Sequence, residues 1–307
     1  MKAVVLAGFG GPEKKGDIRP FLEVVLRGRP VPPHRIDEVV GQYEQIGGRS
    51  PYNDLARSLA SVLEERFRHQ NVTVSVGMRN GPPTMADTLT DLKRRGVTDV
   101  VAVVLAAYRS VPSWNYYLQT MAQAIHEVGK GLRVRFVGPY FKEDRFVKAV
   151  SARVQEALET IPPELKKKAR WIFTAHSIPV SWDKNSGYSQ QIRHLCERVV
   201  SGFGQTDWHL SYQSRSGRPE DPWLEPDIGD FITQSKDIQG RAVLVIPVGF
   251  IMDHVEVLFD LDIKAKKAVD AVGARYFRAK TVGEHPLFLD LLEEKIKDLF
   301  SQMDCVP

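Results

Sequence analysis

Three carboxylates follow an apolar run in the last quarter of the chain, at a spacing that could do chemistry. The run over residues 243–248 ends at Gly249, and Asp253, Glu256 and Asp260 come next. Residues three or four positions apart share one face of a helix, so a strand is expected to lead into a helix over 253–272 whose first turns carry acids. Ligands of open α/β sheets bind beyond the carboxyl ends of the strands, which is where these acids would lie.

Two other expected strand ends in the same half carry polar side chains. His176 closes one strand in the stretch Phe173–Pro179, and Ser211–Pro219 continues past another. Pro179 argues against a helix start there and leaves the imidazole facing a loop-lined space. Since parallel strands end at one edge of a sheet, we expect the three ends to converge on one crevice. Taken singly, His176 is equally well explained as a core histidine, and the acids as a solvated helix face.

A neutral imidazole beside carboxylates suits a divalent metal that is held briefly and passed on. Borderline ions such as Fe²⁺ and Co²⁺ accept nitrogen and oxygen donors together. HExxH, zinc-finger and G-x-S-x-G patterns are absent from the sequence, which disfavours a metalloprotease, a structural zinc site and a serine hydrolase. The glycines after the first strand do not complete a dinucleotide fingerprint, because Glu13 stands where the third glycine is needed.

Composition narrows the class of protein further. The 307 residues are 43% hydrophobic and 26% charged, which is typical of a globular protein of two domains. A net charge of +4, from 42 basic and 38 acidic residues, is too balanced for a nucleic-acid partner. The apolar runs are too short for a membrane span or a secretory signal, so we expect a cytoplasmic protein. Cys196 and Cys305 cannot build a four-cysteine iron–sulfur cluster, and no tightly bound cofactor is expected.

Strands and helices are expected to alternate along the whole chain, which predicts an α/β fold with parallel sheets. The expected strands are 2–6, 72–76, 100–107 and 133–137, then 170–175, 209–212, 242–246 and 274–278. Helices are expected from about residue 55, over 84–95, 143–159, 190–200, 228–234 and 287–300, besides 253–272. We predict an N-terminal domain over 1–138 and a C-terminal domain, with the acids and His176, over 139–284. The final helix, within 285–307, must pack on one of the two sheets, and a return to the first domain is one option.

Several sequence motifs, taken together, resemble those of the ferrochelatase family. In the second half these are Phe173–Pro179, Tyr212–Gly217 with Pro222–Asp227, and Gly249–Glu256 with Asp260 and Asp262. In the first half they are Phe9–Glu13, Pro20–Glu23, Arg27–Arg29, Ile46–Pro51 and Gly77–Asn80. The match runs in order along nearly the whole chain. The resemblance implies two similar Rossmann-like domains with a porphyrin cleft between them, and insertion of Fe²⁺ into a porphyrin in haem biosynthesis, a lyase reaction with iron as substrate.

The resemblance also implies roles for individual residues. His176 and Glu256 correspond to the catalytic pair that meets the metal and takes the two pyrrole protons, and Asp260 would continue the acidic line as a further metal residue. Ser50 and Tyr117 match positions that touch the porphyrin. Three arginines, Arg27, Arg29 and Arg49, would pair with its propionates.

The residues in these motifs are most similar to those of the ferrochelatases of Gram-positive bacteria, a branch that generally acts on coproporphyrin III. Protoporphyrin IX is the other candidate substrate. The chain departs from the family pattern at Glu13, where some relatives have a tyrosine, and at Lys264, where relatives often keep a third carboxylate. It also departs at 106–115 and 185–188. Two alternatives stay open: a cobalt chelatase for a sirohydrochlorin-type ring, and a non-catalytic tetrapyrrole-binding protein of the same fold. A monomer without a nucleic-acid partner is expected.

Overall fold

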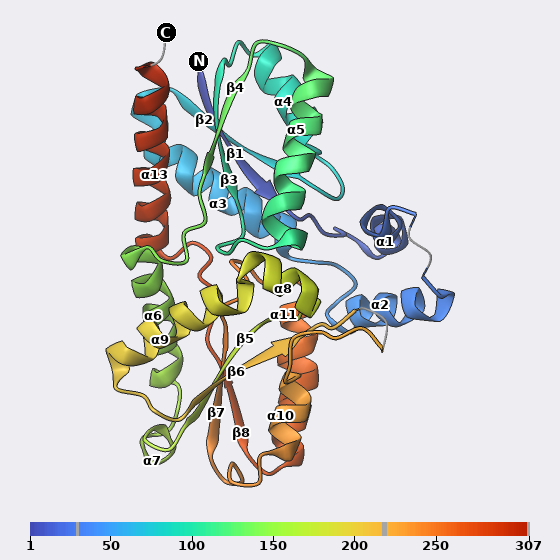
Figure 1. Cartoon of the computed structure of the whole chain (residues 1–307), viewed down its shortest axis with the longest axis vertical. Coiled ribbons are helices and arrows are strands. Elements are labelled where there is room, and N and C mark those ends of the chain that lie inside the picture. The colour runs from blue at the N-terminus through green and yellow to red at the C-terminus, as the bar shows by residue number, and fades with distance from the viewer. Residues whose placement is uncertain (29–30, 217–219, 306–307) are drawn as a thin grey trace. The chain divides into compact units, whose positions relative to one another are not determined.

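The computed structural model describes residues 1–28, 31–216 and 220–305. The chain divides into two compact units (Figure 1). Unit 1 consists of Met1–Leu105, Pro112–Pro139 and Phe288–Pro307, and unit 2 of Ala106–Val111 and Tyr140–Leu287. Each unit has one four-stranded parallel sheet flanked by helices, so the predicted α/β class with two parallel sheets is confirmed.

The sheet of unit 1 has the strand order β2-β1-β3-β4. Its strands are β1 (Lys2–Gly8), β2 (Val72–Met78), β3 (Asp99–Val104) and β4 (Arg133–Val137). All six residues of β3 are buried, as in a strand covered on both faces, whereas the edge strand β4 has exposed positions. The strand predicted over 100–107 ends at Val104, where the backbone bends at Leu105; residues 106–111 belong to unit 2.

The helices of unit 1 include one that returns from the far end of the chain. They are α1 (Ile18–Leu26), α2 (Pro33–Gln45), α3 (Tyr52–Phe67), α4 (Met85–Arg94), α5 (Tyr116–Val128) and α13 (Pro286–Asp304), with short 3-10 turns at Lys15–Asp17 and Arg68–Gln70. Thr84 and Asp87 form a capping box at the start of α4, which confirms the predicted cap. Helix α13 runs beside the strands of unit 1 (Figure 1), where Lys2 Nζ lies 2.7 Å from an Asp304 carboxylate oxygen.

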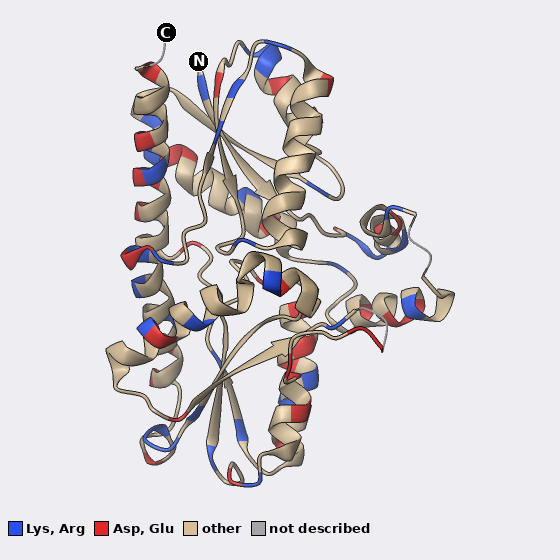
Figure 2. Ribbon diagram, in the orientation of Figure 1, with Lys and Arg blue, Asp and Glu red and all other residues tan. Residues whose placement is uncertain are grey.

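The sheet of unit 2 repeats the design, with the order β6-β5-β7-β8. Its strands are β5 (Arg170–His176), β6 (Trp208–Gln213), β7 (Ala242–Pro247) and β8 (Arg275–Arg278). The central parts of the inner strands carry no charge in either unit; Figure 2 shows Lys, Arg, Asp and Glu at strand ends, on edge strands, and on helices and loops. Parallel pairing places His176 opposite Gln213, so the carboxyl ends of β5 and β6 are level.

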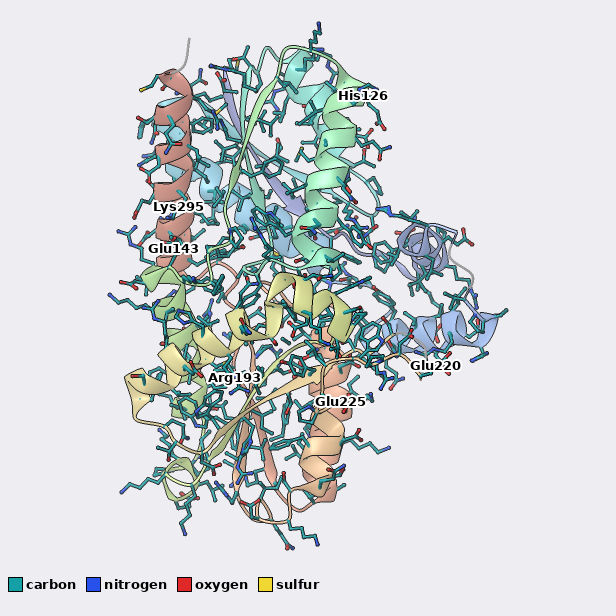
Figure 3. All side chains as sticks on the ribbon, viewed as in Figure 1. His126, Glu143, Arg193, Glu220, Glu225 and Lys295 are labelled. Atoms are coloured by element: carbon teal, nitrogen blue, oxygen red, sulfur yellow. The ribbon has the colours of Figure 1, made fainter. Side chains whose placement is uncertain are left out.

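Seven helices accompany this sheet within the described residues. They are α6 (Asp144–Glu159), α7 (Pro163–Lys166), α8 (Val180–Ser186), α9 (Tyr188–Phe203), α10 (Ile228–Gln234), α11 (Val255–Leu258) and α12 (Lys266–Ala271). Helix α9 packs on β6, with the Arg193 guanidinium 5.8 Å from the centre of the Trp208 indole ring; Figure 3 labels Arg193. No helix of the described residues is long and apolar enough to cross a bilayer.

One helix prediction in unit 2 is wrong, and a second is right in its extent but not in its geometry. Helix α8 begins directly after Pro179, because this proline takes the N-cap position with extended backbone angles and gives up no hydrogen bond there. The helix expected over 253–272 is present over 255–271, but its hydrogen bonding changes to π-helical over Asp260–Ala265, between α11 and α12. A second π-helical segment, Val111–Asn115, precedes α5. Such segments occur frequently at functional sites.

Candidate functional site

His176 and Glu256 are in contact at the carboxyl edge of the sheet in unit 2. His176 is the last residue of β5, and Glu256 lies in the first turn of α11. The imidazole Nε2 is 3.4 Å from Glu256 Oε1, with the two side chains 26% and 36% exposed. The structure therefore brings together the two residues that the sequence singled out for catalysis.

The two side chains shift each other's pKa in opposite directions. Burial alone would lower the pKa of His176, but the charge of Glu256 and its hydrogen bond outweigh burial and raise it. Burial alone would raise the pKa of Glu256, but the charge and hydrogen bond of His176 lower it to about 2. The contact therefore favours the protonated form of the imidazole and the ionised form of the carboxyl, because each charge stabilises the other. The His176 Nδ1–H donates to the carbonyl of Ser177, which turns Nε2 toward Glu256.

Gly249 makes this approach possible. A Cβ at Gly249 would lie 2.6 Å from the Ala175 Cα, which is closer than two carbon atoms can pack, and 3.3 Å from the His176 nitrogen, which is a tight contact. The Gly249 N–H donates to the Thr174 carbonyl at 3.1 Å, so the chain leaving β7 stays against the end of β5. Glycine is needed here for close approach of two backbones, not for an unusual φ angle.

Gln213, at the end of β6, joins the elements that carry the pair. Its side chain is almost fully buried; Oε1 accepts a hydrogen bond from Thr174 Oγ1 at 2.6 Å, and Nε2 donates to the carbonyl of Glu256. Its own carbonyl accepts the Ser177 N–H at 2.8 Å. In the sequence, the only signal for a role of Gln213 is its position at the end of an expected strand, within the motif Tyr212–Gly217.

His254 was also missed as a contributor. Its Nδ1 accepts the Glu256 N–H at 3.0 Å, which makes His254 the N-cap of α11. Burial lowers the pKa of His254, in keeping with an unprotonated Nδ1 acceptor. The Phe250 ring packs edge-on against it, with 4.2 Å between ring centres. A side chain that can accept a hydrogen bond, placed two residues before Glu256, is the sequence signal for this cap.

Asp260 lies beyond α11, at the start of the π-helical segment. Ser214, whose φ of 63° is left-handed, donates its hydroxyl to the Asp260 carboxylate. Burial raises the pKa of Asp260 to about 6; the charge of Glu256 adds to this, and the Ser214 hydrogen bond and the charges of Lys264 and His176 oppose it. Lys264, which interrupts the acidic row, is exposed and acts on Asp260 through its charge.

The three residues predicted to meet a metal do not gather as a closed site. Among residues 1–28, 31–216 and 220–305 there is no group of three or more His, Cys, Asp and Glu side chains that could hold an ion. His176 and Glu256 contact each other, whereas Asp260 is bonded to Ser214. Asp253 and Asp262, the other acids of this segment, both bond to Arg278.

The predicted porphyrin contacts of unit 1 lie around the loop that follows β1. Ser50 is buried, and its Oγ accepts the Tyr52 N–H at 3.2 Å. The Tyr52 hydroxyl accepts the Phe9 N–H at 3.0 Å and also bonds to Tyr117, which is buried as well. Tyr52 therefore links Ser50 and Tyr117, although the sequence assigned it no role.

Two of the three predicted arginines have partners within unit 1. Arg27 Nη2 donates to Asn80 Oδ1 at 3.1 Å, and Arg49 forms an ion pair with Asp54. Arg29 falls outside the described residues. Glu13, the departure from the family pattern, lies 2.7 Å from Arg57 Nη1, and this hydrogen bond is the first cause that lowers the pKa of the Glu13 carboxyl.

Comparison with known proteins places the chain in a family. The family model "Ferrochelatase" matches residues 1–299. A ferrochelatase of Rhodopirellula baltica is 36% identical over 99% of this chain and 87% of its own length. Coproporphyrin III ferrochelatases of Mycobacterium leprae and Nocardia farcinica are 35% and 36% identical, each over 97% of this chain, and 89% and 88% of their own lengths are covered.

Solved structures agree at the level of the fold. The structure of SirB from Bacillus subtilis with Fe³⁺ superposes with a TM-score of 0.62 over 97% of this chain and 94% of SirB, at 12% identity. The sirohydrochlorin chelatase SirB of Bacillus subtilis subspecies spizizenii with cobalt gives 0.56 over the same shares, at 11% identity. At such identities the likeness establishes the chelatase fold alone. The family model and the relatives go further, and by them this chain belongs to the ferrochelatase family and is an enzyme that inserts metal into a porphyrin.

Proposed function

We propose that this chain inserts Fe²⁺ into coproporphyrin III, with His176 and Glu256 as the residues that receive the pyrrole protons. The contact of these two side chains, 3.4 Å apart at the end of β5, is the observation that carries the proposal. The names of the Mycobacterium and Nocardia relatives support coproporphyrin III as the substrate.

Metal insertion releases two protons: the porphyrin loses both pyrrole N–H protons and binds one divalent ion. Glu256 is ionised at neutral pH, but its pairing with His176 lowers its pKa to about 2 and makes it a weak base while that pairing lasts. His176, with its raised pKa, must first lose the proton that it shares with Glu256. Binding of a cation beside the pair favours that loss, because metal ions compete with protons for imidazole and carboxylate.

Asp260 is suited to carry protons away from the pair. With a pKa of about 6 it takes up and releases a proton near neutral pH, and the charges of Glu256 and His176 both act on it. Ser214 holds its carboxylate in place by a hydrogen bond. A proton carrier with a pKa close to the working pH passes protons in both directions without a large free-energy cost.

The propionates of the substrate would compete with partners that the arginines already have. Arg27 donates to a neutral amide of Asn80, and a propionate is the stronger acceptor for a guanidinium. Arg49 would have to exchange its ion pair with Asp54. Coproporphyrin III, with four propionates, offers more such contacts than protoporphyrin IX.

An anaerobic assay tests this function. The purified protein should insert Fe²⁺ into coproporphyrin III faster than into protoporphyrin IX, as followed by the porphyrin absorption spectrum. His176→Ala should abolish insertion while porphyrin binding remains. Full activity of this variant would refute the catalytic assignment, and equal rates with the two porphyrins would refute the choice of substrate.

The two alternatives from the sequence are not favoured. The relatives that cover nearly the whole chain are named for iron and porphyrin, and the likeness to the cobalt-bound SirB is one of fold. A binding protein that has lost turnover would not need the contact between His176 and Glu256, which this chain keeps. Cytoplasmic location, a monomeric state and the lack of a tightly bound cofactor remain predictions from the sequence.

A further inference from the structure

Arg278, the last residue of β8, bonds to two carboxylates at once. Its Nε and Nη2 lie 2.6 and 2.9 Å from the two oxygens of Asp262, a bidentate pair. Its Nη2 and Nη1 also lie 3.1 and 3.4 Å from the oxygens of Asp253. The Arg278 side chain is only 14% exposed. Charge-assisted bonds with this geometry are among the strongest that side chains form.

Each carboxylate receives a further hydrogen bond from the β8 edge of unit 2. Thr281 Oγ1 donates to Asp253 at 3.0 Å, and the Tyr276 hydroxyl donates to Asp262 at 3.3 Å. Burial raises the pKa of Tyr276, so its hydroxyl stays protonated and keeps donating. The carboxylates are therefore satisfied on several sides, as partly buried charges must be.

The two aspartates mark the ends of the segment that carries the candidate site. Residues 253–262 include His254, Glu256 and Asp260. The helical run begins only at Val255, and its hydrogen bonding changes from α-helical to π-helical at Asp260. Val257 and Leu261 pack in the core, and the bonds from Arg278 to Asp253 and Asp262 connect both ends of the segment to β8, which pairs with β7 through Arg278 opposite Val245.

We propose that Arg278 is a positioning residue for metal insertion: by gripping Asp253 and Asp262 it fixes the segment that holds Glu256 against His176. This inference rests on the function proposed above. Arginine is required because its planar fork can serve two carboxylates, whereas a lysine ammonium is a single point of charge. Arg278 touches neither Glu256 nor His176 in the described bonds, so it acts through the segment.

The same unit offers a matched control. Arg170, the first residue of β5, is 10% exposed and also bridges two aspartates: its Nη2 is 2.5 Å from Asp237 and its Nε is 2.6 Å from Asp207. It lies at the amino end of the strand, whereas His176 lies at the carboxyl end. Arg170→Lys therefore reproduces the loss of a two-carboxylate clamp away from the site.

The test compares Arg278→Lys with Arg170→Lys in the full chain. Both should lower the thermal midpoint. Arg278→Lys alone should reduce kcat for Fe²⁺ insertion about 10- to 100-fold, because displacement of a catalytic group by an ångström costs that much. Porphyrin affinity, measured by quenching of protein fluorescence, should stay within about twofold of wild type, since the relative orientation of catalytic groups and not substrate affinity is perturbed.

A milder variant keeps the inference open to refutation if Arg278→Lys does not fold. Thr281→Val keeps Arg278 and removes one bond to Asp253, and should lower kcat by a smaller factor without changing porphyrin affinity. Wild-type kcat per folded molecule in the variants at positions 278 and 281 would overturn the inference, as would an equal loss in Arg170→Lys. If the wild type inserts no metal, the proposed function fails instead, which is a separate result.

Discussion

Thr174→Val isolates the buried link between β5 and Glu256. Valine has nearly the shape of threonine but cannot donate, so the 2.6 Å bond from Thr174 Oγ1 to Gln213 Oε1 is lost without a cavity. Thr174 is 0% and Gln213 1% exposed, and water cannot replace the donor. A buried acceptor left without a partner costs about 1–3 kcal/mol, which is the expected loss in free energy of unfolding.

Thr174→Val should also lower kcat for metal insertion. Gln213 donates to the Glu256 carbonyl through the amide whose oxygen has lost its partner, so a rotation that finds Oε1 a new donor also withdraws Nε2 from Glu256. If about half of the lost free energy, roughly 1 kcal/mol, appears as a misplaced Glu256 in the transition state, kcat falls about fivefold. Thr174→Ser keeps a hydroxyl and should restore most of the rate.

The assay pairs denaturant unfolding with Fe²⁺ insertion, and Thr88→Val is the control. Thr88 is a buried threonine of unit 1 whose Oγ1 donates to the Val76 carbonyl at 2.8 Å. Thr88→Val should lose a comparable free energy of unfolding and keep kcat. The reasoning is refuted if Thr174→Val keeps wild-type kcat, or if Thr88→Val loses as much of it.

Two further outcomes follow from the site. Lys264→Gln removes a charge that lowers the pKa of Asp260, so this pKa should rise above about 6, and the acid limb of the pH profile of kcat/KM for Fe²⁺ should move to higher pH. The control is Lys267→Gln, an exposed change on α12 that should leave the pH profile in place. A pH profile that Lys264→Gln does not move would contradict the role of Asp260. Gly249→Ala should destabilise the protein by about 1–3 kcal/mol in denaturant unfolding, because its Cβ would lie 2.6 Å from the Ala175 Cα. Gly202→Ala, which has open space on α9, should be neutral or stabilising, and equal destabilisation by both changes would contradict the packing argument.

The strands could be predicted from the sequence because their signal is local. Continuous apolar runs such as Val243–Ile246 can be satisfied only between two layers of helices, and each predicted strand appears in the structure. The π-helical segment after Glu256 could not be predicted, because acids four residues apart, such as Glu256 and Asp260, are compatible with α-helical and with π-helical backbone. The prediction at Pro179 was wrong for another reason: proline ends a helix that precedes it but is compatible with a helix that follows it.

The candidate site divides in the same way. His176 and Glu256 could be found because the ends of neighbouring parallel strands must meet. In the sequence, Thr174 and Gln213 look like ordinary residues of buried strands, because the hydrogen-bond partners that define their roles are 39 and 43 residues away. Arg278 looks like a charged residue on an edge strand, because its two aspartates are 16 and 25 residues away. Local patterns hold no information on which distant group will satisfy a buried donor or acceptor.

Helix α13 determines the order in which the two units can finish folding during translation. Unit 1 is assembled from three separate stretches of chain, and its last stretch, from Phe288 onward, leaves the ribosome after all of unit 2. Arg66 on α3 then finds Asp290 at 2.6 Å and Glu293 at 3.0 Å, partners made more than two hundred residues later. Until that moment the face of unit 1 that α13 covers stays open, whereas unit 2, almost continuous in sequence, can complete its core first. A nascent chain of this protein therefore completes the folding of unit 1 last, and a chaperone that binds the nascent chain would be needed at unit 1.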